Sequence, residues 1–268
     1  MPINLAPLLD TVKSKLLSIR ANHPRYTLST KAINGQLSIE YTTIPLSKPC
    51  KYVLLYYSGD CVYAFKKLIW LFQRCADNQM LQMDNVCSTL ETYVNGWASG
   101  KEITSRNIKA LQNMVSARHD VIKRTIHEYD DLRKTFDSLN THDDTEMVDH
   151  FELSLYQTVS EFPYRRAYKH FFKKDKVNDK LIETHLQTDR EILDRLIQLM
   201  TVLYMGWNKV GKGDAYEKYR LRQRDLILIV DQFADVVSLD IDLYERFATL
   251  NETVIAFKVY PYEKMNDD

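Results

Sequence analysis

The chain has 268 residues, a mass of 31.5 kDa, and 36 basic against 36 acidic side chains. This length suffices for one large domain or two small ones, and the balanced charge excludes a protein that binds polyanions over its whole surface. Glycine and proline, at 7 residues each, are too scarce for collagen-like, low-complexity or repeat-rich β architecture.

The start of the sequence and its cysteines indicate a protein that is not secreted. The N-terminus lacks the basic and apolar regions of a signal peptide, and the longest weakly polar stretch, 196–208, is shorter than the roughly 20 residues of a spanning helix. The four cysteines form no C-x-x-C pair, so we expect neither a zinc site nor a redox motif. We therefore expect a cytoplasmic or virion-associated protein without a transmembrane segment, and leave peripheral membrane contact open.

The first 100 residues predict a helix, a β-hairpin, a further strand and a second helix. The hairpin prediction depends on Asn34-Gly35, a residue pair that favours a tight turn, between two stretches rich in Thr, Ile and Tyr. In chain order, the expected elements are a helix over 5–21, hairpin strands over 26–33 and 36–44, a strand over 51–57 and a helix over 58–72.

Residues 101–162 contain neither Gly nor Pro, so nothing local interrupts a helix there. Mostly apolar side chains recur at alternating spacings of three and four, the pattern of a long helix packed against another helix. This seam consists of Ile108, Leu111, Val115, Arg118, Ile122, Thr125, Tyr129, Leu132, Phe136 and Leu139. A polar break follows at 140–144, and we expect a second helix from Thr141 to Phe162, ended by Pro163.

A further seam predicts another long helix. It consists of Ile182, Leu186, Asp189, Leu193, Leu196, Met200 and Leu203, of which only Asp189 is out of character. We expect Gly206 to end this helix as a C′ glycine. A capping box at 214–217 then opens a helix, and residues 253–260 have the composition of a strand.

Together these elements predict a mostly α fold of the α+β class. We expect a long-helix bundle with a small antiparallel β-sheet near the N-terminus, which the C-terminal strand could join. The expected domains are a small α+β module over 1–100 and the helical bundle, with the possible returning strand, over 101–268.

Opposite charges are concentrated in neighbouring segments. Residues 164–224 hold 15 basic and 8 acidic side chains, whereas residues 225–268 hold 3 basic and 10 acidic side chains. Such segments either neutralise each other within one chain or bind a second copy of it. We expect a homo-oligomer that forms through the long helices and these charged segments.

Aromatic and basic residues alternate in the segment 164–176. On a helix, Tyr164, Tyr168 and Phe171 would share one face, flanked by basic side chains that could contact the phosphates of RNA or DNA. The same pattern also occurs on ordinary solvated helix faces. A second basic cluster surrounds the glycine-containing loop 208–213. The predicted nucleic-acid-binding residues are Arg165, Arg166, Lys169, Lys173, Lys174, Lys176, Lys209, Lys212, Arg220, Arg222 and Arg224.

No common hydrolase, dehydrogenase or protease motif is present, so we expect a non-enzymatic structural or assembly protein, of a kind that suits a viral or phage component. Glu146 and His150 have metal-ligand spacing but lack a second such pair, so we expect no metal and no cofactor. The alternative is a helical-bundle ribonuclease, in which Arg165 would hold the scissile phosphate and His170, at R-x4-H spacing, would transfer a proton.

Overall fold

A computed structural model of the chain describes residues 4–24, 51–57, 59–76, 79–139, 142–149, 177–206, 214–250 and 258–261. The hairpin predicted at 26–44 lies outside these residues. The helices are α1 Ala6–Ala21, α2 Gly59–Ala76, α3 Gln79–Ala98, α4 Ser105–Leu139, α7 Asp179–Gly206 and α8 Asp214–Thr249. The strands are β1 Lys51–Tyr57, β2 His142–Asp149 and β3 Lys258–Pro261.

The fold is a helical bundle, and the predicted α+β class is wrong. Of the residues whose side chains the structure describes, 92% are helical and none lies in a strand. The class was predicted because short β-rich runs in the first 100 residues suggested a module of their own. Helix α3, which completes this part of the chain, instead packs its apolar side chains into the bundle.

The described strands do not form an N-terminal sheet either. Strand β1 occupies the expected residues 51–57, and its backbone pairs on one edge with β2 and on the other with β3, both antiparallel. The register places Leu54 opposite Glu146 in β2 and opposite Val259 in β3. The three strands therefore come from distant parts of the sequence.

Strand β2 corrects the helix that we predicted from Thr141 to Phe162. Residues 142–149 are paired with β1 along its whole length, with a register shift between Tyr56 and Tyr57. The segment is acidic and carries few β-branched residues, so its own composition does not favour a strand. Pairing with a distant strand overrides the weak local preference. The rest of that predicted helix lies outside the described residues.

The chain forms two compact units. The first, here called the bundle unit, contains α1, α3, α7 and most of α4 and α8. The second, the sheet unit, contains the three strands, most of α2, and the C-terminal ends of α4 and α8. The division of the chain into 1–100 and 101–268 stays a prediction.

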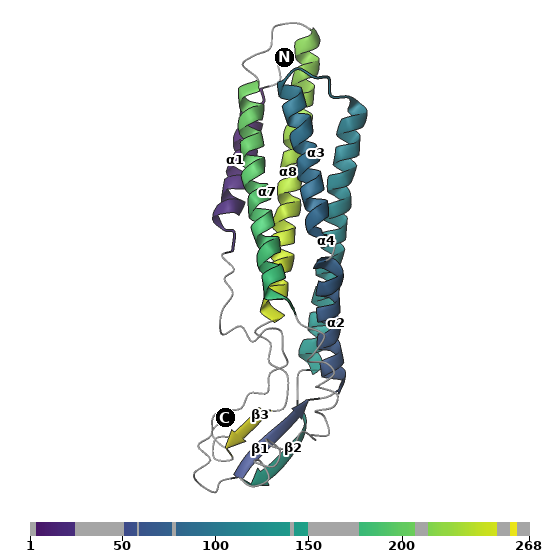
Figure 1. Ribbon diagram of the computed structural model, residues 1–268, viewed down its shortest axis with the longest axis vertical. Coiled ribbons are helices and arrows are strands. Elements are labelled where there is room, and N and C mark those ends of the chain that lie inside the picture. The colour runs from purple at the N-terminus through teal and green to yellow at the C-terminus, as the bar shows by residue number, and fades with distance from the viewer. Residues whose placement is uncertain are drawn as a thin grey trace. The chain divides into compact units, whose positions relative to one another are not determined.

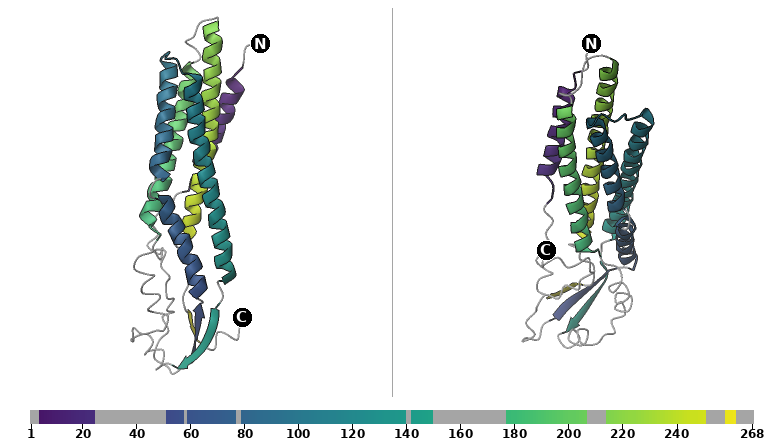
Figure 2. Two further views of the ribbon diagram at one scale, coloured as in Figure 1. Left: turned by 90° about the vertical axis from the view of Figure 1, so that its right-hand side faces the viewer. Right: turned by 45° about the horizontal axis from the view of Figure 1, so that its top comes forward.

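The bundle unit is assembled along the predicted seams. Its long helices lie side by side with nearly parallel axes (Figure 1), as two further views confirm (Figure 2). Every residue of the 182–203 seam is buried, including Asp189. The seam on α4 has its apolar residues Ile108, Leu111, Val115 and Ile122 at 5% exposure or less in this unit. Hydrophobic burial of these stripes drives the helices together.

Helix α1 is attached to the bundle by one apolar stripe and by ionic contacts of two basic side chains. Its buried side chains are Leu9, Val12 and Leu16. Lys15 contacts carboxylates on α8, with Nζ 2.8 Å from Asp231 and 2.7 Å from Asp235, and Arg20 contacts Asp194 on α7 at 2.7 Å. Helix α1 therefore contacts both α7 and α8.

The sheet unit has an aromatic core. Phe65 of α2 lies against Phe136 of α4, with ring centroids 5.7 Å apart. Phe247, near the end of α8, contacts Phe72 at 5.1 Å and Tyr129 at 5.5 Å, both edge to face. Offset and edge-to-face ring contacts stabilise such a core beyond the area that they bury.

Gly206 ends α7 for a reason other than the one predicted. A C′ glycine adopts a positive φ, but among the described glycines only Gly100 does so, at 83°. Gly206 instead lies against the indole of Trp97, and a Cβ at this position would be 2.5 Å from Cζ3 and 2.7 Å from Cη2 of that ring. The site requires glycine because helix α3 approaches closely there.

This contact predicts opposite effects for two buried glycines. Gly206→Ala should lower the free energy of unfolding by about 1–3 kcal/mol, because the methyl group would overlap a rigid ring. Gly96→Ala, within α3, should raise it by about 0.5–1 kcal/mol, because alanine favours helix and its Cβ would have the nearest atom at 3.6 Å. Urea unfolding of both variants tests this. Equal effects of the two would contradict it.

Candidate functional site

Most of the residues predicted to bind nucleic acid lie outside the described part of the chain. These are Arg165, Arg166, Lys169, Lys173, Lys174, Lys176, Lys209 and Lys212. His170, and with it the Arg165–His170 pair of the ribonuclease alternative, also lies there. Both hypotheses about this segment stay predictions.

The remaining three predicted residues lie on α8, where two of them make contacts within the bundle unit. Arg220 is 4% exposed, and its guanidinium lies 5.7 Å from the centre of the Tyr216 ring. Arg222 donates to Asp225 at 2.8 Å and to Ser105 Oγ at 2.5 Å. Arg224 is exposed. Only Arg224 of these three therefore has a side chain that is mainly in contact with solvent.

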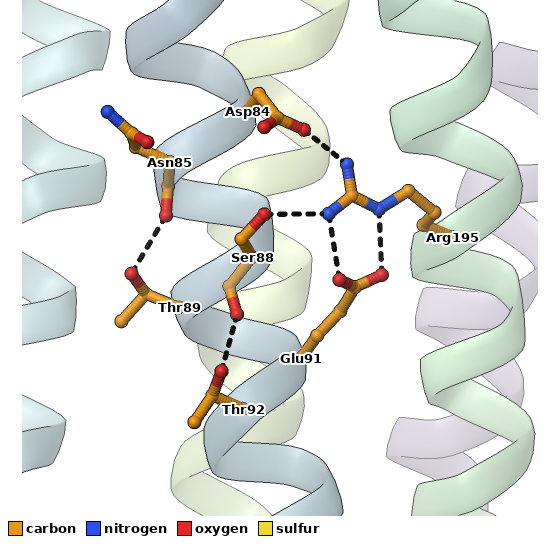
Figure 3. A network of polar contacts seen from close by, with 7 residues as sticks. All are labelled: Asp84, Asn85, Ser88, Thr89, Glu91, Thr92 and Arg195. Atoms are coloured by element: carbon orange, nitrogen blue, oxygen red, sulfur yellow. Dashed lines mark hydrogen bonds and ion pairs between the residues drawn. The ribbon is translucent and has the colours of Figure 1, made fainter.

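A branched polar network joins α3 to α7. The guanidinium of Arg195 donates two hydrogen bonds of 2.7 Å to Glu91, one of 2.5 Å to Asp84 and one of 3.0 Å to Ser88 Oγ (Figure 3). Asp84, Ser88 and Glu91 lie one turn apart on the same face of α3, so a single arginine on α7 spans them. The hydrogen bonds to Glu91 hold the pKa of Arg195 above its usual range.

This network is suited to holding two helices together. A bidentate arginine–carboxylate contact has a specific geometry, which lysine cannot reproduce. The side chain of Arg195 is 27% exposed, so solvent partly screens its charge. Two threonines of α3 each donate a hydrogen bond to the backbone carbonyl one turn earlier. Thr92, for example, donates to the Ser88 carbonyl at 2.9 Å (Figure 3).

The most unusual chemistry of the bundle unit is a pair of buried aspartates. Asp189 of α7 and Asp240 of α8 are each 1% exposed and hydrogen-bond to each other. Gln79, in the first turn of α3, donates its side-chain amide to Asp240 Oδ1 at 2.9 Å. Two carboxyl groups can hydrogen-bond only when one of them carries a proton.

Burial determines where this proton is held. Loss of solvent raises the pKa of Asp189 well above its usual range, and the neighbouring charge of Asp240 raises it further. Burial also raises the pKa of Asp240, to about 7, although the hydrogen bond from Gln79 and the charge of Arg118 oppose this. At neutral pH we therefore assign the proton to Asp189, which donates it to Asp240.

A neutral histidine lies one turn along α7 from this pair. The ring of His185 stacks on that of Tyr244, with centroids 4.0 Å apart, and its Nε2 lies 3.3 Å from the tyrosine hydroxyl. Burial lowers the pKa of His185 to about 4, so the ring is uncharged at neutral pH. Its other nitrogen can then donate to the Ala76 carbonyl, while Nε2 accepts from Tyr244.

These side chains can share a proton, but a dissolved substrate cannot reach them. His185, Asp189, Asp240 and Tyr244 are at most 1% exposed. A general acid or base must come within hydrogen-bond reach of its substrate. We therefore assign the group to the core of the bundle, where its hydrogen bonds fix how α3, α7 and α8 meet. Of its members, the sequence indicated only Asp189, as the polar residue on an apolar seam.

A shallow hollow lies between α4 and α8 on the bundle unit. Its volume is about 270 Å³, and it is lined by Val115, Ser116, His119, Asp120, Gln232, Asp235 and Val236. His119 Nδ1 lies 3.4 Å from Asp120, and Asp235 is engaged by Lys15. Its charged and imidazole groups are thus already engaged with neighbouring side chains.

Nowhere in the described segments do three metal-ligating side chains come together, and none of the described helices has the length and apolar character to cross a bilayer. Glu146 lies in strand β2, so it does not share a helix face with His150. No protein-family model matches the chain, and comparisons with curated proteins and with solved structures found no match.

The buried proton predicts how stability depends on pH. An aspartate whose pKa is raised on folding stabilises the protein at low pH, and this stability is lost as pH rises from about 4 through the folded-state pKa. His185, whose pKa is lowered, has the opposite effect between about pH 4 and 6.5. The two contributions oppose each other there, so the effect of the aspartates should be clearest above about pH 6.5.

Asp189→Asn should therefore raise the melting temperature at about pH 8.5 by roughly 2–6 °C over the unchanged protein, and by less at about pH 5. The asparagine amide donates to Asp240 as the protonated Asp189 does, but it cannot ionise. Thermal unfolding followed by circular dichroism measures this. Glu191→Gln, an exposed change on the same helix, is the control and should leave the pH profile unchanged. Parallel profiles for Asp189→Asn and the unchanged protein would contradict the proton assignment.

The arginine network predicts a loss of stability from a conservative change. Arg195→Lys should lower the free energy of unfolding by about 1–2 kcal/mol, because an ammonium cannot bond Glu91 and Asp84 in the same geometry. Arg133→Lys, which affects an ion pair within α4 at 3.0 Å from Asp137, should cost less than about 0.5 kcal/mol. Urea titrations compare the two. A loss of stability for Arg195→Lys no larger than that for Arg133→Lys would contradict this role of the arginine network.

Proposed function

We propose that the protein is a non-enzymatic structural or assembly protein that associates with copies of itself. The observation that carries the proposal is a group of exposed apolar side chains at one end of the bundle unit. Tyr204 and Met205, in the last turn of α7, are 53% and 61% exposed, and Leu221 of α8 is 43% exposed. A second copy that covers them would remove this apolar surface from water.

These three residues lie at the same end of the bundle unit. Gly206, directly after Met205, accepts a hydrogen bond from the Tyr219 hydroxyl at 3.2 Å. Leu221 lies two residues beyond Tyr219 on α8, so it is at the same end of the helix but on a different side from Tyr219. Trp97 of α3 stacks on Tyr219 at 4.3 Å and so fixes the ends of α3, α7 and α8 together. The apolar side chains are thus presented on a rigid base, which lowers the entropic cost of association.

The charges of the bundle unit favour an apolar rather than an ionic contact between its copies. Several acids of the segment 225–268 are paired within the chain, Asp225 with Arg222, Asp231 and Asp235 with Lys15, and Asp242 with Arg246. Because these acids already have partners, we propose that the ionic contribution to self-association comes from the basic segment 164–176. The same segment is the proposed contact for RNA or DNA.

We place this protein in the cytoplasm or in a virion, as a component of a viral or phage assembly would be. In support, the described Cys87 is a buried free thiol, as is usual in a reducing compartment. Burial raises the pKa of Cys87 to about 12, so that this thiol is unreactive at neutral pH.

Size-exclusion chromatography with light scattering tests the self-association. The full chain should form concentration-dependent oligomers that persist at about 0.5 M salt, because an apolar contact is not screened. The combined change Tyr204→Ser, Met205→Gln and Leu221→Gln should raise the dissociation constant about tenfold or more. The matched control is Leu81→Gln, which alters an apolar side chain that is 62% exposed in the first turn of α3, and should have no effect.

Two results would overturn the proposal. The first is a full chain that stays monomeric at every concentration. The second is a triple variant that associates as tightly as the unchanged protein. Exposed substitutions of this kind change stability little. Circular dichroism of each variant should therefore show the helix content of the unchanged protein.

A further inference from the structure

One face of α2 combines exposed aromatic rings with lysines. Lys66, Lys67 and Trp70 follow Tyr63 by three, four and seven residues, so the four share one side of the helix. Tyr63 is 48% exposed and Trp70 is 43% exposed. The opposite side of the helix is anchored in the core of the sheet unit by Phe65, Leu68 and Phe72, each at most 1% exposed. We call the exposed group the aromatic–lysine face (α2 in Figure 1).

The four side chains are arranged against one another. The rings of Tyr63 and Trp70 lie at 90°, with centroids 6.3 Å apart. Lys66 Nζ lies 5.0 Å from the centre of the Trp70 ring, and Lys67 Nζ lies 4.8 Å from the centre of the Tyr63 ring. Each ammonium group therefore lies over the face of an aromatic ring. Another flat or positively charged group could occupy the same face in its place.

We propose that the aromatic–lysine face binds single-stranded nucleic acid, with bases stacking on Trp70 and Tyr63 while Lys66 and Lys67 contact the phosphates. This inference rests on the proposed contact with RNA or DNA. It adds a second binding surface to the one proposed for the segment 164–176. A base that stacks on a ring displaces the ammonium, which swings on its flexible stem toward the neighbouring phosphate. Stacking tolerates any base sequence, because every base has a flat face.

Other partners match this face less well. An apolar protein surface would bury two ammonium groups without a counter-charge, at a high desolvation cost. A lipid surface needs a broad apolar side on the helix, whereas here the other apolar residues of α2 face the core. A nucleotide strand alone offers flat rings and negative charge at alternating positions.

The described acids near this face cancel only part of its positive charge. Asp60, one turn before Tyr63, is exposed and opposes one of the two lysines. Glu128 of α4 is engaged by the guanidinium of Arg74, one turn beyond Trp70. The described residues thus leave one positive charge beside the rings, which is sufficient to orient a strand but not to bind it tightly by charge alone.

The test uses the full chain and fluorescein-labelled oligothymidylate and oligouridylate of about 15 nucleotides, measured by anisotropy. Trp70→Ala should weaken binding by about 5- to 100-fold, and Trp70→Phe should restore most of it because the ring is retained. Lys67→Gln should reduce the salt dependence of the binding constant by about one released ion. Leu81→Ala, at an exposed apolar site in the other unit, should change neither value.

Tryptophan fluorescence gives a second readout that a general loss of fold would not produce. Unlabelled oligonucleotide should quench the emission of the full chain, and Trp70→Phe should remove most of this quenching while binding persists. A duplex of the same sequence should bind more weakly, because its bases are already stacked on each other.

The outcomes separate this inference from the proposed function. If the strands bind but Trp70→Ala and Lys67→Gln do not weaken binding, the aromatic–lysine face is refuted while the proposed contact through 164–176 stands. If no single strand binds, the aromatic–lysine face is refuted, whereas the proposed contact through 164–176 is refuted only if the duplex also fails to bind. Self-association is judged by its own experiment. Equal binding to duplex, or binding to anionic phospholipid vesicles in place of the strands, would likewise overturn the assignment.

Discussion

The proton shared between Asp189 and Asp240 is the constraint on which the bundle unit depends. Apolar seams bring α7 and α8 together, but such seams tolerate sliding by a turn, because the next turn presents similar side chains. A buried carboxyl pair does not tolerate it, since a shift would leave each carboxylate without a partner in a dry interior. Gln79 extends the constraint to α3, which gives these three helices one register.

This constraint explains why polar chemistry in the interior serves the fold and why we look for function on the surface. The two aspartates hydrogen-bond to each other and Tyr244 to His185, and Arg195 uses its guanidinium on three side chains of α3. Side chains suited to partners lie elsewhere, at the end of α7 and on the outer side of α2. A rigid interior then presents these surfaces in a fixed arrangement within each unit.

Local periodicity predicted the long helices well, because helix seams repeat within a few residues. The seams at 108–139 and 182–203 correspond to α4 and α7. Contacts between distant segments were not predictable in this way. Strand β2 depends on its pairing with β1, and Gly206 on Trp97 of another helix. The aromatic–lysine face was not predicted although its spacing is visible in the sequence, because the apolar side of α2 alone is sufficient to indicate a helix. Asp189 was visible in the sequence as a polar residue on an apolar seam, whereas no sequence pattern indicated its partner Asp240.

Infrared spectroscopy of the folded protein at neutral pH tests the shared proton most directly. A protonated carboxylic acid has a carbonyl stretch separate from those of ionised carboxylates and of the backbone amide. We predict such a band at about pH 7, where exposed aspartates and glutamates are fully ionised. It should be weaker in Asp189→Asn, where only Asp240, with a pKa of about 7, can hold the proton, and unchanged in Glu191→Gln. A spectrum without this band, or a band that is unchanged in Asp189→Asn, would contradict the central role of the buried pair.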